Sequence, residues 1–218
     1  MLPTKLLTAA SGKMTKIVQV GTATGVTSAT LPAHQSGDLI IGVAVNLETS
    51  GTPTLPSKPT GWTDYLTRSG LSLAAARVSY KIATSSSETS GTWTDADAVA
   101  FNVVRGQNTT DWSGRNGSAA YSDVVDFFNY KLQSGLEVND GTSVVVAFSF
   151  ANSGDPVMNA PPALTRLENI IRFSPTTMQT AIFSSLNGVS NWGNPGYFID
   201  AGTTVWIGWN VSIEIKSS

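Results

Sequence analysis

The chain has 218 residues, no cysteine and a net charge of −2, which excludes structural disulfides and thiolate metal sites and gives no electrostatic basis for binding DNA or RNA. Only 13% of the residues are charged and 41% are hydrophobic, so we expect a neutral, polar surface around a core large enough to need no cross-links. The longest apolar runs, such as residues 39–45, are too short to span a bilayer.

Residues 1–16 are expected to form an N-terminal arm that precedes the folded domain. The hydrophobic stretch in this segment is too short for a secretory signal. It is typical instead of a flexible arm, or of an extended peptide that becomes ordered on a partner. Leu2, Leu6 and Leu7 are the leucines of this arm.

The remainder of the chain, residues 17–218, is typical of β-strands separated by turns. Residues 39–45 and 144–150 are apolar on both faces, which predicts strands in the middle of a packed sandwich. Residues 78–82 and 211–215 alternate apolar with polar side chains, which predicts strands with one solvent-facing side. Clusters rich in Gly, Ser and Pro between these runs predict turns.

Residues 122–132 give an ambiguous pattern. Val125, Phe128 and Leu132 form a stripe at helical spacing, but the Val, Phe and Tyr content fits a strand equally well. A helix and a strand therefore both remain open for this segment.

The chain also repeats itself. Residues 36–56 and 139–165 both contain a Gly-led turn, an apolar run, a polar loop and a Pro-rich exit, and corresponding positions such as Thr63 and Thr165 lie 102 residues apart. We therefore predict an internal repeat of about 17–110 and 121–216. The predicted fold is an all-β, jelly-roll-like antiparallel β-sandwich built from two similar halves, with an extended N-terminal arm. Two tandem sandwiches of about a hundred residues each are the alternative.

Residues with catalytic or metal-binding chemistry are sparse. His34 is the single histidine, and no G-x-S-x-G pattern accompanies it for a Ser-His-Asp triad. Asp95 and Asp97 are the nearest approach to a carboxylate cluster, which in a loop would hold calcium and otherwise is simply solvated. Two of the fifteen acidic residues could still converge as a glycosidase pair, although nothing marks one. We predict that the protein is not an enzyme and has no metal site or cofactor.

Aromatic residues in loop-like contexts are the strongest candidates for binding. Trp112, Tyr121, Trp192 and Tyr197 stand beside Asn, Ser and Gly residues. Exposed aromatic rings can stack on sugars or anchor a protein interface. Trp62, Trp206 and Trp209 are expected to serve the core instead.

Four stretches of the first half carry a family resemblance: TSATLPAHQSGDLIIGVAV, TPTLPSKPTGWT, ARVSYKIAT and VAFNVVRG. They resemble a pattern of β-rich proteins encoded among tailed-phage virion genes, and similar jelly-roll folds occur in capsid cement (decoration) proteins and in tail-associated proteins. The resemblance covers mainly residues 24–106 and brings no catalytic residues. It implies a virion structural protein, most simply a decoration protein on the capsid surface, made in the cytoplasm of a bacterial host.

The partners that the resemblance implies are the major capsid protein and other copies of this chain, the latter as a homotrimer at local three-fold positions. The arm would add as a strand to a neighbouring subunit or to the capsid protein, with Leu2, Leu6 and Leu7 in apolar pockets. No direct nucleic-acid or membrane partner is expected. The alternative is a carbohydrate-binding module of a tail fibre or secreted protein, with Trp112 and Trp192 as stacking platforms.

Overall fold

The computed structural model describes most of the chain from Lys16 to Ser218. In the strand residues 120–131, 153, 156–158, 171–172 and 196–206 it describes the backbone alone. No helix occurs among the described residues, and hence none that could cross a membrane. The described ranges are 16–48, 50–69, 73–131, 135–153, 156–158, 160, 163–172, 178–190, 192 and 196–218.

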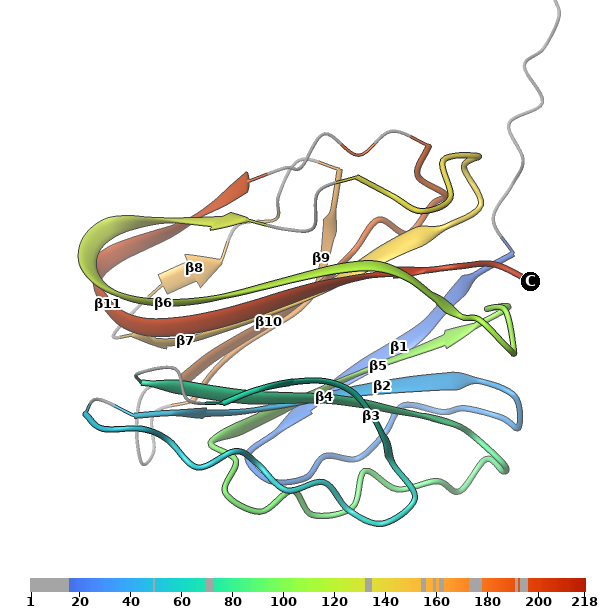
Figure 1. The fold of residues 1–218 in the computed structure, drawn as a ribbon, viewed down its shortest axis with the longest axis horizontal. Helices are drawn as coiled ribbons and strands as arrows, with labels where there is room; N and C mark the ends of the chain where they lie inside the picture. Colours follow the sequence, from blue (N-terminus) through green and yellow to red (C-terminus); the bar gives the residue numbers. More distant parts are fainter. Residues whose placement is uncertain are drawn as a thin grey trace, which may run out of the picture.

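The first half of the chain forms one antiparallel sheet, which lies below the second sheet in Figure 1. Its strands are ordered β1-β5-β2-β4-β3 across the sheet. The strands are β1 (Val18–Gly25), β2 (Leu39–Leu47), β3 (Thr63–Arg68), β4 (Ala74–Ile82) and β5 (Ala98–Arg105).

The second half forms the facing sheet, with the order β6-β11-β7-β10-β9. The short strand β8 pairs with the first residues of β11, next to the place where β7 ends. The strands are β6 (Ser113–Lys131), β7 (Val144–Ser153), β8 (Pro156–Met158), β9 (Thr165–Arg172), β10 (Met178–Ser184) and β11 (Gly196–Ile215).

The two sheets share one topology. If β1, β2, β3, β4 and β5 are matched in turn to β6, β7, β9, β10 and β11, the two strand orders are identical. The prediction of an antiparallel β-sandwich built from two similar halves is confirmed, and the alternative of two tandem sandwiches is wrong. The path of the chain is simpler than the Greek keys of many jelly rolls, because among the described strands it passes between the sheets only from β5 to β6.

The two halves pack with approximate two-fold symmetry. β5 contacts β10, and the corresponding pair β11 and β4 are also in contact, while β2 contacts its own counterpart β7. β1 contacts β9 on one side of the sandwich, and hydrogen bonds join β3 to β6 on the other side. Exchanging the halves therefore reproduces each of these pairs of neighbours, as in a two-fold dimer joined into one chain.

The core between the sheets explains why the central strands are apolar on both faces. Every residue of β2 is buried, with Ile41 and Val43 facing the second sheet and Ile40 and Ala44 facing outward into a separate cluster. Gly42 sits between these residues, where an added Cβ would come within 2.9 Å of the Phe101 and Trp62 rings. A larger residue at this position would displace the aromatic layer outside the sheet.

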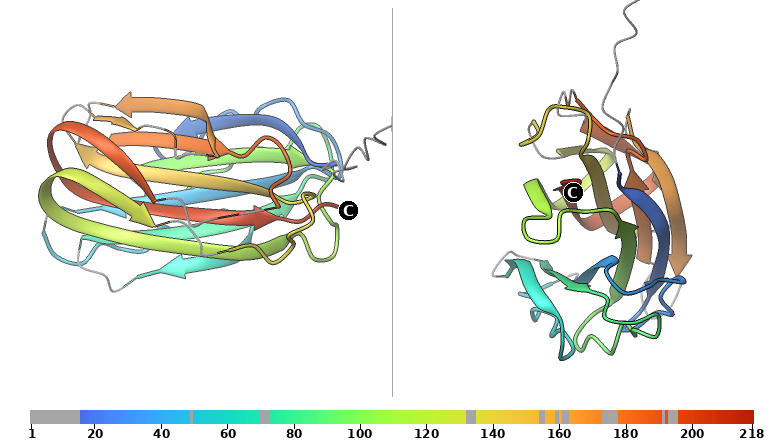
Figure 2. Two further views of the ribbon diagram at one scale, coloured as in Figure 1. Left: turned by 90° about the horizontal axis from the view of Figure 1, so that it is seen from above. Right: turned by 90° about the vertical axis from the view of Figure 1, so that its right-hand side faces the viewer.

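Loops cover the outer face of each sheet. On the first sheet Trp62, Trp93 and Phe101 lie at the centre of an outer cluster, and on the second sheet Phe183 and Trp192 belong to a similar one. The molecule therefore has four layers, loop, sheet, sheet and loop, as the edge-on views in Figures 1 and 2 illustrate.

This covering corrects one prediction. Ser212 and Glu214 on the polar side of β11, and Ser79 on the polar side of β4, are fully buried. The alternation was correct, because Val211, Ile213 and Ile215 do face the inner core. The prediction that the polar side faces solvent was wrong for these residues, because parts of the chain distant in sequence lie over that side.

The segment left open between helix and strand belongs to β6, which continues as a strand to Lys131. β6 and β11 have 19 and 20 residues, whereas their counterparts β1 and β5 have 8 each. In Figure 2 the extra length of β6 and β11 bends back at the end of the molecule opposite the C-terminus. We call this extension, residues 120–131 and 196–206, the β6–β11 ribbon.

Candidate functional site

The predicted arm residues Leu2, Leu6 and Leu7 lie outside the described residues, and their role stays a prediction. The described chain begins at the end of the sandwich that also holds the C-terminus, where Ser218 N donates to Gly106 O. Ile17 is buried in the core between the sheets. Gly106, with φ of +87°, packs so closely on Lys16 that a Cβ would overlap the Lys16 carbonyl oxygen. The base of the arm is therefore held firmly by the sandwich.

Trp112 is not a surface residue, which corrects the prediction. It is 6% exposed, and its ring centroid lies 5.1 Å from that of Tyr65 and 5.0 Å from that of Tyr80. Trp112 follows the crossing between the sheets, and there its ring closes the core on the side where edge strands β3 and β6 meet. A ring enclosed in this way offers no face to a sugar.

The prediction for Trp192 is also wrong, because this residue is 6% exposed and belongs to the outer cluster on the second sheet. Its polar sequence neighbours suggested an exposed loop, but Trp192 itself packs with apolar residues of the outer sheet face, among them Ala147 and Phe183. Tyr121 and Tyr197 are on the β6–β11 ribbon, opposite Gly208 and Tyr130 respectively. Their side chains lie outside the described residues, so their predicted surface contacts stay untested.

His34 has a structural position. Its Nδ1 lies 2.7 Å from Pro32 O, and its Nε2 accepts a hydrogen bond from Glu88 N at 3.1 Å. Glu88 in turn accepts from Thr84 N and from Lys81 Nζ, and these bonds from Thr84 and then Lys81 lower the pKa of Glu88 to about 2. This group ties the loop before β2 to the loop after β4.

An ion pair between the buried carboxylate of Asp38 and the partly exposed side chain of Arg105 lies at the same end of the first sheet. Both carboxylate oxygens of Asp38 accept from Arg105, at 2.6 and 2.7 Å, and one also accepts from Gln35 N. Burial alone would raise the pKa of Asp38, but the hydrogen bonds and charge of Arg105 outweigh it and the pKa lies below its ordinary value. The bidentate geometry fixes the turn before β2 against the end of β5.

The second sheet uses a different polar contact. Glu214 in β11 is fully buried, and its carboxylate accepts from the backbone N–H groups of Arg115, Glu137 and Val138 at 3.0, 2.6 and 2.9 Å. Next to it, Lys216 Nζ donates to the carboxylates of Asp111 and Glu137. Glu214 therefore holds the loop before β7 on the outer face of the sheet.

The carboxylates considered for calcium are separated in role. Asp95 is exposed and has φ of +60°, as in a tight turn, whereas Asp97 Oδ2 accepts from Leu47 N at 2.8 Å. Burial raises the pKa of Asp97. No group of three or more His, Cys, Asp or Glu side chains that could hold a metal ion occurs among the described residues.

A shallow hollow of about 480 Å³ lies over the outer face of the first sheet. Its lining is rich in hydroxyl groups, but Ser90, the buried one, already accepts from Ala29 N and donates to Gly91 O. No charged or aromatic side chain lines it among the described residues. The lining residues are Ser28, Ala29, Thr30, Thr89, Ser90, Gly91 and Thr92.

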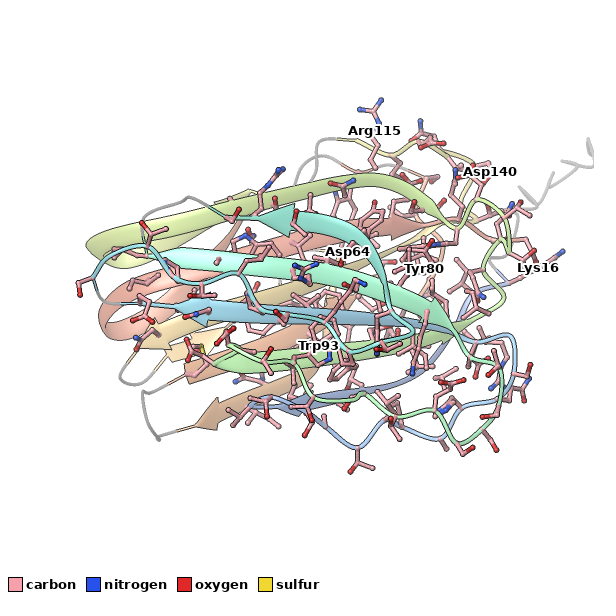
Figure 3. All side chains as sticks on the ribbon, turned by 60° about the horizontal axis from the view of Figure 1, so that its bottom comes forward. Lys16, Asp64, Tyr80, Trp93, Arg115 and Asp140 are labelled. Carbon is pink, nitrogen blue, oxygen red and sulfur yellow. The ribbon has the colours of Figure 1, made fainter. Side chains whose placement is uncertain are left out.

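The features that sequence reasoning missed are the edges of the sheets. Because loops cover both wide faces, the strand edges available to a partner among the described residues are those of β1, β3, β6 and β9 and of the short strand β8. Figure 3 shows the labelled side chains spread over several elements, with Lys16 and Asp140 towards the end that holds the base of the arm and Asp64, Tyr80 and Trp93 nearer the middle. Only the strand order, which no single strand reveals, could have identified these edges.

Comparison with protein-family models, with curated proteins and with solved structures finds no match to this chain. Function must therefore be inferred from the residues and from their arrangement.

Proposed function

We propose that the protein is a structural protein of a tailed-phage virion, most simply a capsid decoration protein that binds the outer surface of the major capsid protein shell and stabilises it. It is not proposed to be an enzyme. The resemblance of residues 24–106 to virion proteins suggests this role, and the use of the buried polar residues supports it.

The observation that carries the proposal is the position of the buried and half-buried ionisable groups. His34 and Glu88 join two loops, Asp38 fixes a turn to Arg105, and Glu214 holds a loop on the second sheet. In catalytic sites such groups lie close together in a cleft, where their different environments shift their pKa values. In this protein they are distributed between loops and sheets, which is the arrangement of a scaffold.

The remaining surface also suits a lattice-binding role. The low content of charged residues reduces the cost of removing water from broad contacts. A sandwich with a third and fourth layer buries both outer sheet faces, so binding is left to the edges, the ends and the arm. We therefore keep the arm, with Leu2, Leu6 and Leu7, as the proposed contact to the shell or to a neighbouring copy.

Co-sedimentation tests the proposal. The full chain is mixed with shells assembled from the major capsid protein encoded by its genomic neighbours, and bound protein is measured in the pellet. We expect saturation at hundreds of copies per shell and an increase in the temperature at which the shells open. Absence from the pellet, together with saturable binding on a glycan array, would favour the carbohydrate-binding alternative.

Variants of the arm refine the test. Deletion of residues 1–14 should abolish or strongly weaken shell binding while the sandwich, which begins at Ile17, keeps its thermal transition. Replacing Leu2, Leu6 and Leu7 by serine should have nearly the same effect. The matched control replaces Thr4, Lys5 and Thr8 by serine and should bind as the full chain does. Full occupancy by the truncated protein would refute the role of the arm.

A further inference from the structure

The longest strand edge of the molecule is the outer edge of β6. β6 is the terminal strand of the second sheet, and among the described residues its edge away from β11 pairs with no other strand. Such an edge presents a row of unpaired N–H and C=O groups, which is a template for another strand. Its first residues are tied to the first sheet, because Asn116 Nδ2 donates to Tyr65 and Arg68 Nε donates to Ser118. Residues 120–131 continue beyond these ties.

The other edges are much shorter. β1, β3 and β9 have 8, 6 and 8 residues and β8 has 3, against 19 in β6. The ladders of β1, β3, β6 and β9 all contain irregularities, and that of β6 has three, so these edges differ in length and not in regularity. β6 contains no proline, and Val125 and Phe127–Lys131 all pair with β11. Among the described strands, the longest edge without a partner strand is therefore that of β6, and much of it lies on the β6–β11 ribbon.

The sequence of this edge is complementary to itself at its ends and at its centre. Two strands related by a two-fold axis perpendicular to a sheet are antiparallel, and one residue lies opposite its own copy. If that residue is Phe127, then Asp123 lies opposite Lys131 of the other copy and Val124 lies opposite Tyr130, each twice. The remaining pairs, Val125 with Asn129 and Asp126 with Phe128, are neither matched in charge nor both apolar. Three types of cross-strand pair that stabilise antiparallel sheets occur in this register. They are a pair of opposite charges (Asp123 and Lys131), a pair of aromatic residues (Phe127 and its copy) and an aromatic with a β-branched residue (Tyr130 and Val124).

We propose that two copies of the chain associate through antiparallel pairing of their β6 strands around Phe127, so that the β6–β11 ribbon continues across a two-fold axis into the ribbon of the partner molecule. The partner is a second copy because the same nine residues, 123–131, supply both sides of the pairing. The inference goes beyond the virion role and does not depend on it. If the inference is correct, the chain self-associates as a dimer and not as the trimer expected from the sequence.

The mass of the full chain in solution is the first measurement. Light scattering after size exclusion should give twice the 22.9 kDa of one chain at high concentration, and a lower mass on dilution. A mass of one chain at all concentrations, or of three chains, would overturn the proposal.

Charge exchange then tests the register. Lys131→Asp gives a chain with aspartate at both 123 and 131, and Asp123→Lys gives one with lysine at both positions. Each variant alone should dissociate at least about tenfold more readily, because two like-charged pairs replace two opposite ones. The two variants mixed should form a heterodimer of wild-type strength, and so should the double variant with itself. Unchanged dimers in both single variants would refute this register.

Cross-linking gives an independent readout in a chain that has no cysteine of its own. Phe127→Cys should form a disulfide-linked dimer on mild oxidation, since the two sulfur atoms would lie across the axis. Val125→Cys and Asn129→Cys should cross-link to each other when mixed, more readily than either does alone. The matched control is Thr67→Cys on the edge of β3, which should stay uncross-linked. Equal cross-linking from Thr67→Cys, or none from Phe127→Cys, would count against the pairing.

Discussion

The first and second halves of the chain form sheets with the same strand order but hold their covering loops with different chemistry. In the first half a charged side chain, Asp38, is neutralised by Arg105. In the second half Glu214 has no such bidentate partner among the described contacts and is held by three backbone N–H groups instead. The two halves share a strand order that depends on the pattern of apolar residues. The polar contacts that hold a loop on each sheet are local, and an ion pair or a set of backbone hydrogen bonds can serve this purpose.

The outer clusters show the same contrast. Trp62 and Trp93 meet edge to face with centroids 5.2 Å apart, and Phe101 lies 6.1 Å from Trp93. The cluster on the second sheet combines Trp192 and Phe183 mainly with aliphatic residues. Both clusters bury an outer sheet face, but the aromatic one concentrates its contacts in fewer side chains.

The largest effect is expected from removing these anchors. Trp93→Ala should lower the free energy of unfolding by about 3–5 kcal/mol, because it leaves a cavity among fully buried rings. The corresponding change in the second half, Trp192→Ala, should cost less, since aliphatic neighbours can close part of the space. Urea titration followed by circular dichroism measures both. An equal or greater loss from Trp192→Ala would show that the aromatic cluster is no more important than its counterpart.

The next largest losses of unfolding free energy are expected from removing the carboxylates that hold the loops, Glu214 and Asp38. Glu214→Ala leaves three partly buried N–H groups without their acceptor and should cost about 3 kcal/mol. Asp38→Ala should cost about 2 kcal/mol, since the Arg105 side chain is already 42% exposed and can turn to water. Hydrogen exchange of the Glu137 and Val138 amides should rise strongly in Glu214→Ala and remain unchanged in Asp38→Ala. Global loosening in both would contradict the view that each tie acts on its own loop.

Acid should act on the first half through Glu88. Its pKa falls from 4.5 to about 2 on folding, so its stabilisation is complete above pH 4.5 and is lost as the pH falls towards 2. Asp38 acts in the same direction, whereas Asp97, whose pKa is raised, gains stability on protonation. In Glu88→Gln, the loss of unfolding free energy between pH 5 and about 2 should be smaller than in the wild type by about 1–2 kcal/mol. The measurement is unfolding free energy at several pH values between 5 and about 2, and an unchanged slope would exclude Glu88 as a contributor.

The smallest effects are expected where the sheet edges meet. Tyr65→Phe removes the hydroxyl that accepts from Asn116 between β3 and β6, and Thr24→Val removes the hydroxyl that donates to Glu168 between β1 and β9. Each should cost about 1 kcal/mol. Approximate two-fold symmetry predicts similar values for the two. A double variant whose cost is the sum of the single costs would show that the two sides act independently.

Much of the fold was predictable from residue patterns. The runs 39–45 and 144–150 identified the central strands of both sheets, because strands covered on both faces need apolar residues at every position. The near-constant spacing of the repeated turns identified the two halves. The pattern of residues 122–132, of which 122–131 lie in β6, was ambiguous, because so few apolar residues satisfy a period of 3.6 and a period of 2 almost equally.

The candidate site was less predictable. Trp112 and Trp192 looked exposed from their neighbours in sequence, yet both are buried by segments distant in the chain. The polar side of β11 looked solvated for the same reason, although Glu214 is fully buried. A polar residue shows that it needs a hydrogen-bond partner, and the partner can equally be water or a backbone group from another loop.

The sequence by itself determined the class of fold, the positions of the central strands and the presence of two similar halves, because these depend on local alternation and on chain length. Only the tertiary structure decided the order of the strands, the covering of both outer faces and the identity of the free edges. Each of these depends on which distant segments exclude water from a given face, and that choice is made by the packing of the whole chain.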